Sequence, residues 1–231
     1  MRKIGLIGGM SWYSTRTYYE HTNRLVQARV GRQHSAPLAI DSLDFAELSR
    51  LSSADEWARA AKVLAASAKQ LQKSGATALL IGANSMHKVY DKVAKAVDVP
   101  IIHIAECVAE RMAKAGVRKA ALLGTGNVML EQFYRQKLIA RDIELLPPEK
   151  PFVDTLDRII YDELLVGRVT RQAERELKTI ITNLAQDGAE AVVLGCTERE
   201  MIVDVDANVL PIYDCTRIHA EAAVDWMLGE G

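Results

Sequence analysis

The stretch GAEAVVLGCTE at residues 188–198 decides the fold, because it predicts a buried strand that runs into a tight turn. Residues 192–194 are apolar and favour a β-strand, and Gly195 lets the backbone bend just before Cys196. The pattern therefore places a cysteine side chain at the end of a strand.

An earlier stretch, GATALLIGANS at residues 75–85, aligns with the cysteine stretch without a gap. The alignment pairs Gly82 with Gly195, Ala83 with Cys196, and Asn84 with Thr197. It indicates two similar half-sites, one with a thiol and the other with a methyl group at the same position.

The internal repeat extends beyond these two stretches. RKAALLGT at residues 118–125 echoes RKIGLIGG at residues 2–9, and residues 143–146 and 209–214 correspond to strands predicted at 38–40 and 99–104. Strands alternate with helical patterns throughout, which is typical of parallel sheets covered by helices on both faces. We therefore predict an α/β fold of two similar Rossmann-like domains, each with a parallel four-stranded sheet, related by a pseudo-two-fold axis.

The bulk composition narrows the class of protein. The 231 residues include 29 Lys and Arg and 30 Asp and Glu, which gives a net charge of -1. This charge favours neither nucleic acid nor an anionic membrane as a partner. No apolar run reaches the roughly 20 residues of a membrane span, and the chain opens on a predicted strand rather than a signal peptide. CxxC and HExxH motifs are absent, so no metal site is expected.

The cysteine count favours a reducing compartment. Three cysteines in a chain of this length do not suggest a disulfide framework, so we expect a cytoplasmic protein. Cys107 and Cys215 lie in no motif and are interpreted as core or incidental residues. His103, near a strand end, is interpreted as polar packing.

The glycine turn at residues 8–11 has two readings. Its backbone N–H groups suit a carboxylate or phosphate, or the turn serves only to pack a helix on the sheet. GxGxxG is absent, so it is not a dinucleotide-binding turn.

The two special turns predict a common site. Ligands of parallel sheets bind beyond the carboxyl ends of the strands, so both turns are expected to line one interdomain cleft. A base on either side of a carbon suits racemisation, in which one group removes the α-proton and another returns one. Asn84, Ser85 and Thr197 are suitable donors to a substrate carboxylate, and the pKa of the Cys196 thiol is expected to fall from about 8.5 toward neutrality.

Three motifs, LIGGMSW at residues 6–12, NSMH at 84–87 and GCTE at 195–198, resemble those of the aspartate/glutamate racemase family, in particular its bacterial broad-specificity amino-acid racemase branch. The resemblance implies an isomerase of amino-acid metabolism, independent of pyridoxal phosphate and metal, that forms a homodimer. It also implies that the C-terminal helix returns to the first domain. The expected domains are residues 1–98 plus 210–231, and residues 99–209.

Residue by residue, the resemblance implies that Cys196 is a catalytic cysteine and that Asn84, Ser85 and Thr197 bind the substrate carboxylate. Met10, which lines the same cleft, and Ser52 are also expected to bind the substrate. Ser52 lies in residues 49–53, a region expected to set selectivity together with residues 157–165. His87 and Glu198 are candidates for supporting positions behind the substrate contacts.

The first catalytic position of the family falls on Ala83, which cannot exchange a proton. Three explanations are open: Ser85 or His87 replaces the missing base; the protein works from one face, as the related arylmalonate decarboxylases do; or the chain binds an amino acid without turnover. The sequence does not identify the amino acid.

Overall fold

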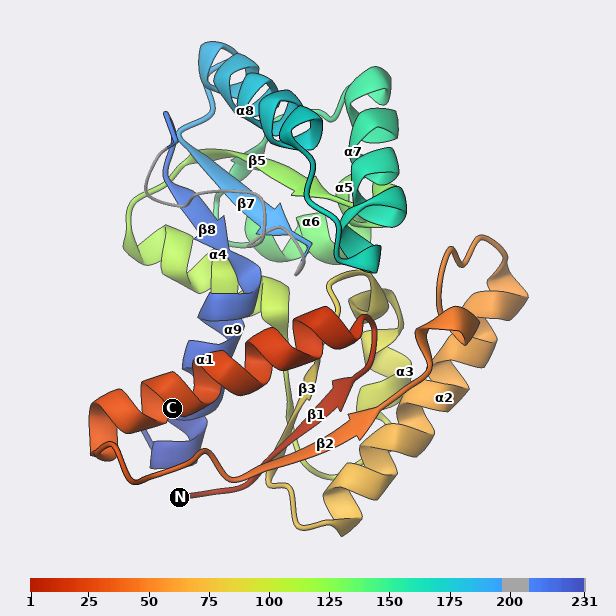
Figure 1. The fold of residues 1–231 in the computed structure, drawn as a ribbon, viewed down its shortest axis with the longest axis vertical. Coiled ribbons are helices and arrows are strands. Elements are labelled where there is room, and N and C mark those ends of the chain that lie inside the picture. The colour runs from red at the N-terminus through yellow and green to blue at the C-terminus, as the bar shows by residue number, and fades with distance from the viewer. Residues whose placement is uncertain (197–207, 231) are drawn as a thin grey trace. The chain divides into compact units, whose positions relative to one another are not determined.

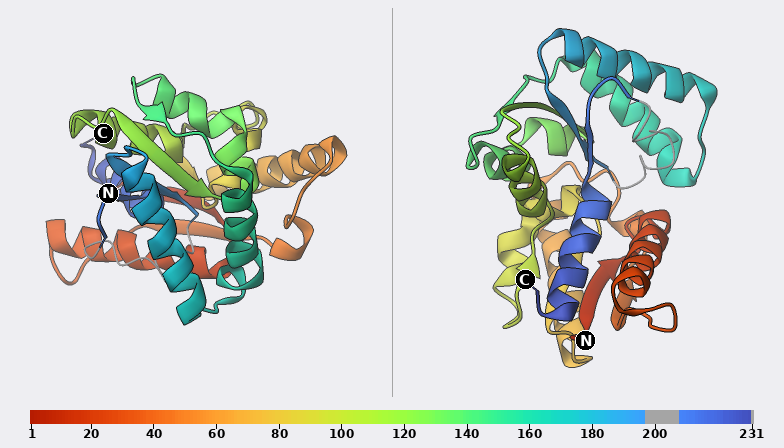
Figure 2. Two further views of the ribbon diagram at one scale, coloured as in Figure 1. Left: turned by 90° about the horizontal axis from the view of Figure 1, so that it is seen from above. Right: turned by 90° about the vertical axis from the view of Figure 1, so that its left-hand side faces the viewer.

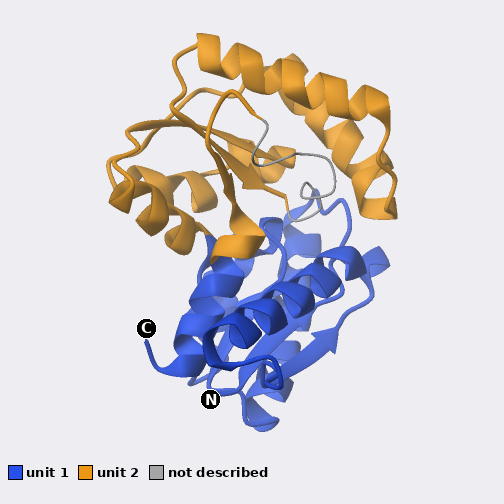
Figure 3. Cartoon of the chain, turned by 60° about the vertical axis from the view of Figure 1, so that its left-hand side comes forward, with its two compact units in different colours: residues 1–104, 219–231 blue, residues 105–218 orange. Residues whose placement is uncertain are grey.

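The chain divides into two compact units in a computed structural model that describes residues 1–196 and 208–230. Unit 1 contains Met1–Ile104 and His219–Gly231, and unit 2 contains Ala105–Ile218 (Figure 3). The C-terminal helix α9 (Cys215–Leu228) begins in unit 2 and continues into unit 1.

The observed unit boundaries differ from the expected ones at residues 98/99 and 209/210. Strand β4 (Ile101–Ile102) pairs with β3 (Ala78–Ile81), so residues 99–104 belong to unit 1. Strand β8 (Ile212–Asp214) pairs with β7 (Ala191–Gly195), so residues 210–218 belong to unit 2. Backbone pairing therefore places both strands in the halves to which the sequence repeat assigns them.

Unit 1 is built on a four-stranded parallel sheet in the order β2-β1-β3-β4 (Figure 1). Its first two strands are β1 (Ile4–Gly8) and β2 (Leu38–Ser42). The helical segments before unit 2 are α1 (Trp12–Val30), η1 (Phe45–Glu47), α2 (Ala54–Lys73), η2 (Ser85–Val89) and α3 (Tyr90–Ala94).

Strand alternation gives this sheet a separate apolar core on each face. Ile7, Leu79 and Ile81 belong to the cluster that contains the buried face of α2. Their neighbours along the strands, including Leu6 and Leu80, belong to a second cluster with residues of α1 and α9. Helix α9 runs along the first sheet (Figure 2), and the Arg2 N–H donates to the Met227 carbonyl at 2.9 Å, which joins both ends of the chain in unit 1.

Unit 2 repeats the design with a four-stranded parallel sheet in the order β6-β5-β7-β8. Its other strands are β5 (Lys119–Gly124) and β6 (Glu144–Leu145). The helical segments are α4 (Ile104–Lys114), α5 (Gly126–Leu130), α6 (Gln132–Ile139), α7 (Lys150–Asp162), η3 (Leu164–Val166) and α8 (Arg171–Gln186).

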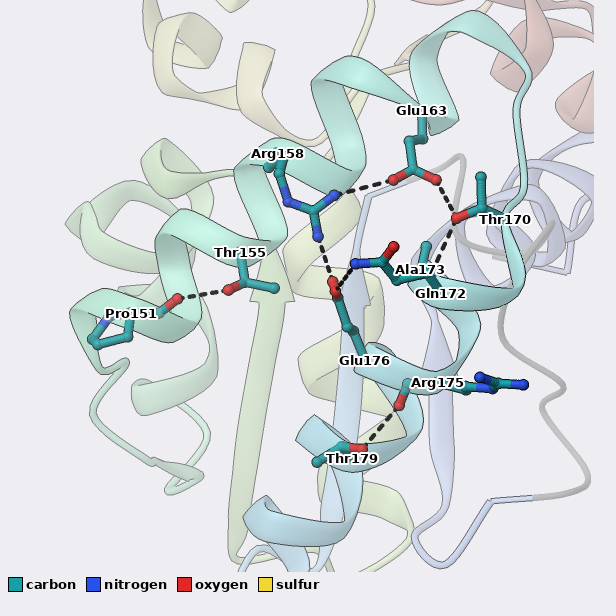
Figure 4. A network of polar contacts seen from close by, with 10 residues as sticks. All are labelled: Pro151, Thr155, Arg158, Glu163, Thr170, Gln172, Ala173, Arg175, Glu176 and Thr179. Atoms are coloured by element: carbon teal, nitrogen blue, oxygen red, sulfur yellow. Dashed lines mark hydrogen bonds and ion pairs between the residues drawn. The ribbon is translucent and has the colours of Figure 1, made fainter.

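Polar contacts connect α7 to the start of α8 on the surface of unit 2 (Figure 4). The Arg158 guanidinium pairs with Glu163 at 3.2 Å and also with Glu176. Thr170 donates to Glu163 at 2.6 Å and accepts from the Ala173 N–H at 3.2 Å, so its hydroxyl caps α8. These polar contacts connect α7 and α8 in addition to the apolar core that both helices share.

The register of the two sheets confirms the sequence repeat. Ile4 pairs with Ala78 in the first sheet, and Ala120 pairs with Ala191 in the second. These are the positions that the repeat aligns. The predicted α/β class with two four-stranded parallel sheets is therefore confirmed.

In the described part of the chain, no helix combines the length and apolar character that crossing a bilayer requires.

Candidate functional site

Unit 1 presents its candidate site where β3 ends and η2 begins. Ala83 and Asn84 form the turn and are almost completely buried, and half-buried Ser85 starts η2. Neither Nδ2 nor Oδ1 of Asn84 has a hydrogen-bond partner among the described residues. Leaving a buried polar group unpaired costs about 1–3 kcal/mol, so the Asn84 amide is a strong candidate for contact with a ligand.

His87 lies one turn beyond Asn84 and is buried. Its Nδ1 lies 3.0 Å from the Ala83 carbonyl oxygen, and its Nε2 accepts from the Ile104 N–H at 3.3 Å. Both ring nitrogens are therefore engaged with the backbone. In this arrangement the ring supports the turn and is not placed as a replacement base for Ala83.

The glycine turn after β1 is held by contacts within unit 1. Gly9 has a φ of +83°, and a Cβ there would lie 2.0 Å from the Leu43 carbonyl oxygen, so only glycine fits. Its N–H donates to Thr15 Oγ1 at 2.7 Å. The Gly9 N–H, one of the backbone donors expected to bind an anion, is therefore already used within the chain. This favours the interpretation that the turn packs a helix on the sheet.

Met10 follows this turn and is buried in the same apolar cluster as Ala83 and Met86. This cluster brings the expected cleft residue Met10 to the carboxyl end of the first sheet, where the Asn84 turn lies. The Met10 side chain is part of the apolar cluster at that end of the sheet.

Ser52 is exposed, and its contacts give it a capping role. Its N–H and Oγ donate to the Glu56 carboxylate at 2.8 and 3.1 Å, next to the capping box formed by Ser53 and Glu56 at the start of α2. The backbone N–H groups of Ser53 and Ser52 lower the Glu56 pKa to about 2. The hydroxyl expected to bind substrate is therefore used at the start of α2.

Unit 2 presents its candidate site where β7 ends. Cys196 follows Gly195, is 7% exposed, and belongs to the apolar core of unit 2. The expected carboxylate donor Thr197 and the expected supporting residue Glu198 lie outside the described residues. None of the three cysteines forms a disulfide.

Thr125 is a further candidate site residue that the sequence did not single out. Gly124 and Gly195 are register partners, so Thr125 and Cys196 leave neighbouring strands at the same edge. Thr125 Oγ1 is buried with no hydrogen-bond partner in the described part of the chain. The only sequence signal for it was a hydroxyl residue after the strand that repeats β1.

Asp157 of α7 holds the turn that follows Thr125. Its Oδ1 accepts from the Gly126 N–H at 2.8 Å, and a Cβ at Gly126 would lie 3.0 Å from its Oδ2. Residues 157–165 were expected to influence selectivity, and the first of them fixes the backbone beside Thr125.

The other two cysteines have raised thiol pKa values. Burial, followed by the nearby Glu110 and Glu106, raises the pKa of Cys107 to about 12. Burial also raises the pKa of Cys215, whose Sγ lies 2.9 Å from the Tyr134 hydroxyl. A raised pKa disfavours the thiolate, which is the nucleophilic form, near neutral pH.

Three of the five histidines form a buried cluster in unit 1 that the sequence did not reveal. The ring of His87 lies 4.6 Å from that of His103 and 6.1 Å from that of His219. Burial, with a smaller effect of His87, lowers the pKa of His219 to about 3, so this residue is neutral near pH 7. Among the described residues, no group of three or more His, Cys, Asp or Glu is arranged to hold a metal ion.

The duplicated sheets, a buried amide after β3 that no described residue pairs, and a cysteine after β7 define a class: duplicated α/β proteins with polar half-sites at the carboxyl ends of equivalent strands. The chain belongs to the Asp/Glu/hydantoin racemase family, whose model matches residues 7–223.

Individual relatives agree with this assignment. The broad-specificity amino-acid racemase RacX of Bacillus subtilis is 21% identical over 167 residues, which are 72% of each chain. A Yersinia pestis protein of the Asp/Glu racemase type has a TM-score of 0.89 and 37% identity, covering 99% of this chain and 100% of its own. An aspartate racemase homologue from Pyrococcus horikoshii has a TM-score of 0.84 and 32% identity, with 98% and 99% coverage.

Proposed function

We propose that this chain exchanges the α-proton of an acidic or other polar amino acid, with Cys196 as the group that transfers the proton. The observation that carries the proposal is the buried Asn84 amide, which has no partner among the described residues at the end of β3. Membership of the racemase family and similarity to the racemase RacX support an amino acid as substrate.

The proposed step moves one proton and one electron pair. The Cys196 thiolate takes the α-proton and becomes a thiol, while the electron pair of the C–H bond moves into the substrate carboxylate. The Asn84 amide, with Ser85 and Thr197 as further donors, stabilises the charge on the carboxylate oxygens. This requires that one substrate reach the turns of both units.

Ala83 determines the stereochemical outcome that we expect. A proton returned by Cys196 restores the original configuration, and inversion requires an acid on the opposite face. Ala83 carries none, and both ring nitrogens of His87 are engaged with the backbone. We therefore expect α-hydrogen exchange with retention to be faster than racemisation.

Incubation with L-aspartate and L-glutamate in heavy water tests the proposal. Proton NMR measures deuterium at the α-carbon, and chiral chromatography measures inversion. Cys196→Ser should reduce exchange at least about 100-fold, the lower range for a lost general acid–base group. Ala83→Cys should raise inversion by a similar factor, whereas Ala83→Ser, which is similar in size but far less acidic, should not.

Two results would contradict the proposal: no exchange across a panel of amino acids, or exchange that persists in Cys196→Ser.

Light scattering on the same samples tests the homodimer that the family resemblance implies. The three cysteines form no disulfide, which agrees with the reducing cytoplasm that we propose, and fractionation of cells expressing the protein would check this placement.

The small side chain of Ala83 favours a second candidate function, a lyase that uses Cys196 as its one proton donor. Such an enzyme would decarboxylate a substituted malonate and protonate the resulting carbanion from a single face. Conversion of a prochiral malonate to one enantiomer, lost in Cys196→Ser, would support it over amino-acid exchange.

A further inference from the structure

His87 connects the Asn84 turn to the segment where the chain leaves unit 1. Its Nδ1 lies 3.0 Å from the Ala83 carbonyl oxygen, which is part of the peptide bond that leads into Asn84. On the other side, its Nε2 lies 3.3 Å from the N–H of Ile104, the residue at which this segment of unit 1 ends. The whole ring is buried, at 2% exposure.

These two contacts fix the protonation state of the ring. A carbonyl oxygen only accepts, so Nδ1 must carry a proton and donate to Ala83. A backbone N–H only donates, so Nε2 must keep its lone pair and accept from Ile104. His87 is therefore held as the neutral Nδ1–H tautomer.

We propose that His87 is a positioning residue that sets the orientation of the Asn84 amide for the substrate carboxylate. The Asn84 side chain has no hydrogen-bond partner of its own among the described residues, so the backbone determines where it points. The Nδ1–H of His87 fixes the carbonyl of the peptide bond immediately before Asn84. This inference rests on the proposed function, because it assigns Asn84 to an amino-acid carboxylate.

The neighbouring His219 provides an internal control. It belongs to the same buried cluster, but its Nδ1 lies 2.7 Å from the Tyr18 hydroxyl and its Nε2 lies 2.9 Å from the Ile102 carbonyl. Neither of these hydrogen bonds involves Ala83 or Asn84. Substitution of His219 should therefore affect packing without changing the direction of the Asn84 amide.

Two substitutions separate the contacts of His87. The amide of Asn occupies the position of Nδ1 in histidine, so His87→Asn keeps a donor for the Ala83 carbonyl and loses the acceptor for Ile104. The longer Gln reaches the position of Nε2, so His87→Gln keeps the acceptor and loses the donor to Ala83. His219→Gln keeps the contact with Ile102 and serves as the matched control.

Calorimetry with L-aspartate and L-glutamate measures affinity, and thermal unfolding measures stability. We expect all three variants to have a lower Tm, because each loses one buried hydrogen bond. His87→Gln should weaken amino-acid binding about tenfold, while His87→Asn and His219→Gln should bind like the parent.

Loss of affinity that follows loss of Tm across all three variants would show a merely structural role and overturn the inference. Unchanged affinity in His87→Gln, with a parent that binds, would also overturn it and leave the proposed function intact. If the parent binds no amino acid, the proposed function itself is wrong. ¹⁵N NMR of histidine-labelled parent tests the geometry without ligand, because His87 must appear as the Nδ1–H tautomer.

Discussion

Asn84 and Thr125 are buried polar residues whose side chains have unpaired atoms in the described structure. One follows β3 in unit 1, and the other follows β5 in unit 2. An unpaired buried group lowers the stability of a protein, so both residues are expected to be retained for contact with a ligand rather than for folding.

Thr125→Val should therefore stabilise the protein and weaken amino-acid binding. Valine has the shape of threonine without the hydroxyl, so the change should raise the free energy of unfolding by about 1 kcal/mol. Urea denaturation and calorimetry measure the two effects. The control is Thr22→Val, because the buried Thr22 hydroxyl donates to the Tyr18 carbonyl at 2.8 Å and its removal should destabilise. A destabilised Thr125→Val protein would show that the hydroxyl has a structural partner.

At the scale of elements, Thr170 connects the start of α8 to α7. Its hydroxyl accepts from the Ala173 N–H and donates to Glu163. Thr170→Ala should lower the free energy of unfolding by about 1 kcal/mol, the usual cost of losing an N-cap. Thr179→Ala is the control, because the exposed Thr179 hydroxyl only donates to the Arg175 carbonyl within the same helix, and alanine favours helix. Equal losses in urea denaturation would contradict the capping role.

The strands could be predicted from sequence because their apolar runs repeat with glycines at equivalent ends. The repeat relates β1 to β5 and β3 to β7, and the β1–β3 and β5–β7 registers agree with it. The expected boundaries separated residues 99–104 and 210–214 from the halves to which the repeat assigns them, and the pairing of β4 with β3 and of β8 with β7 agrees with the repeat.

The candidate site was less predictable than the sheets. Asn84 and Cys196 follow strands in the repeat, so their positions could be inferred. The histidine cluster joins residues that are far apart in sequence and follow no common pattern, and the unpaired state of the Thr125 hydroxyl depends on its surroundings. The contact of Ser52 with the start of α2 could be predicted in part, because Ser53 and Glu56 have the spacing of a capping box.

At the scale of the whole molecule, we expect a core mutation in one unit to reduce the protection of amides from hydrogen exchange in that unit only. Met227 of α9 is 1% exposed in a core of unit 1, and Leu177 of α8 is 1% exposed in the core of unit 2. Either residue changed to alanine should cost about 2–5 kcal/mol. Hydrogen exchange should show lost protection in β1 and β3 for Met227→Ala, and in β5 and β7 for Leu177→Ala. The same pattern in both variants would show that the two units unfold as one.

Helix α9 also has a consequence for the order in which the protein is made. The face of the first sheet that contains Leu6 and Leu80 is covered in part by Ala220, Ala223, Val224 and Met227, which follow unit 2 in the sequence. Unit 2 is synthesised in full before them. Although domains usually fold from the N-terminus onward during synthesis, unit 1 starts before unit 2 in the sequence and is completed after it. Until α9 has been synthesised, the nascent protein therefore exposes an apolar surface of unit 1 that a chaperone would recognise.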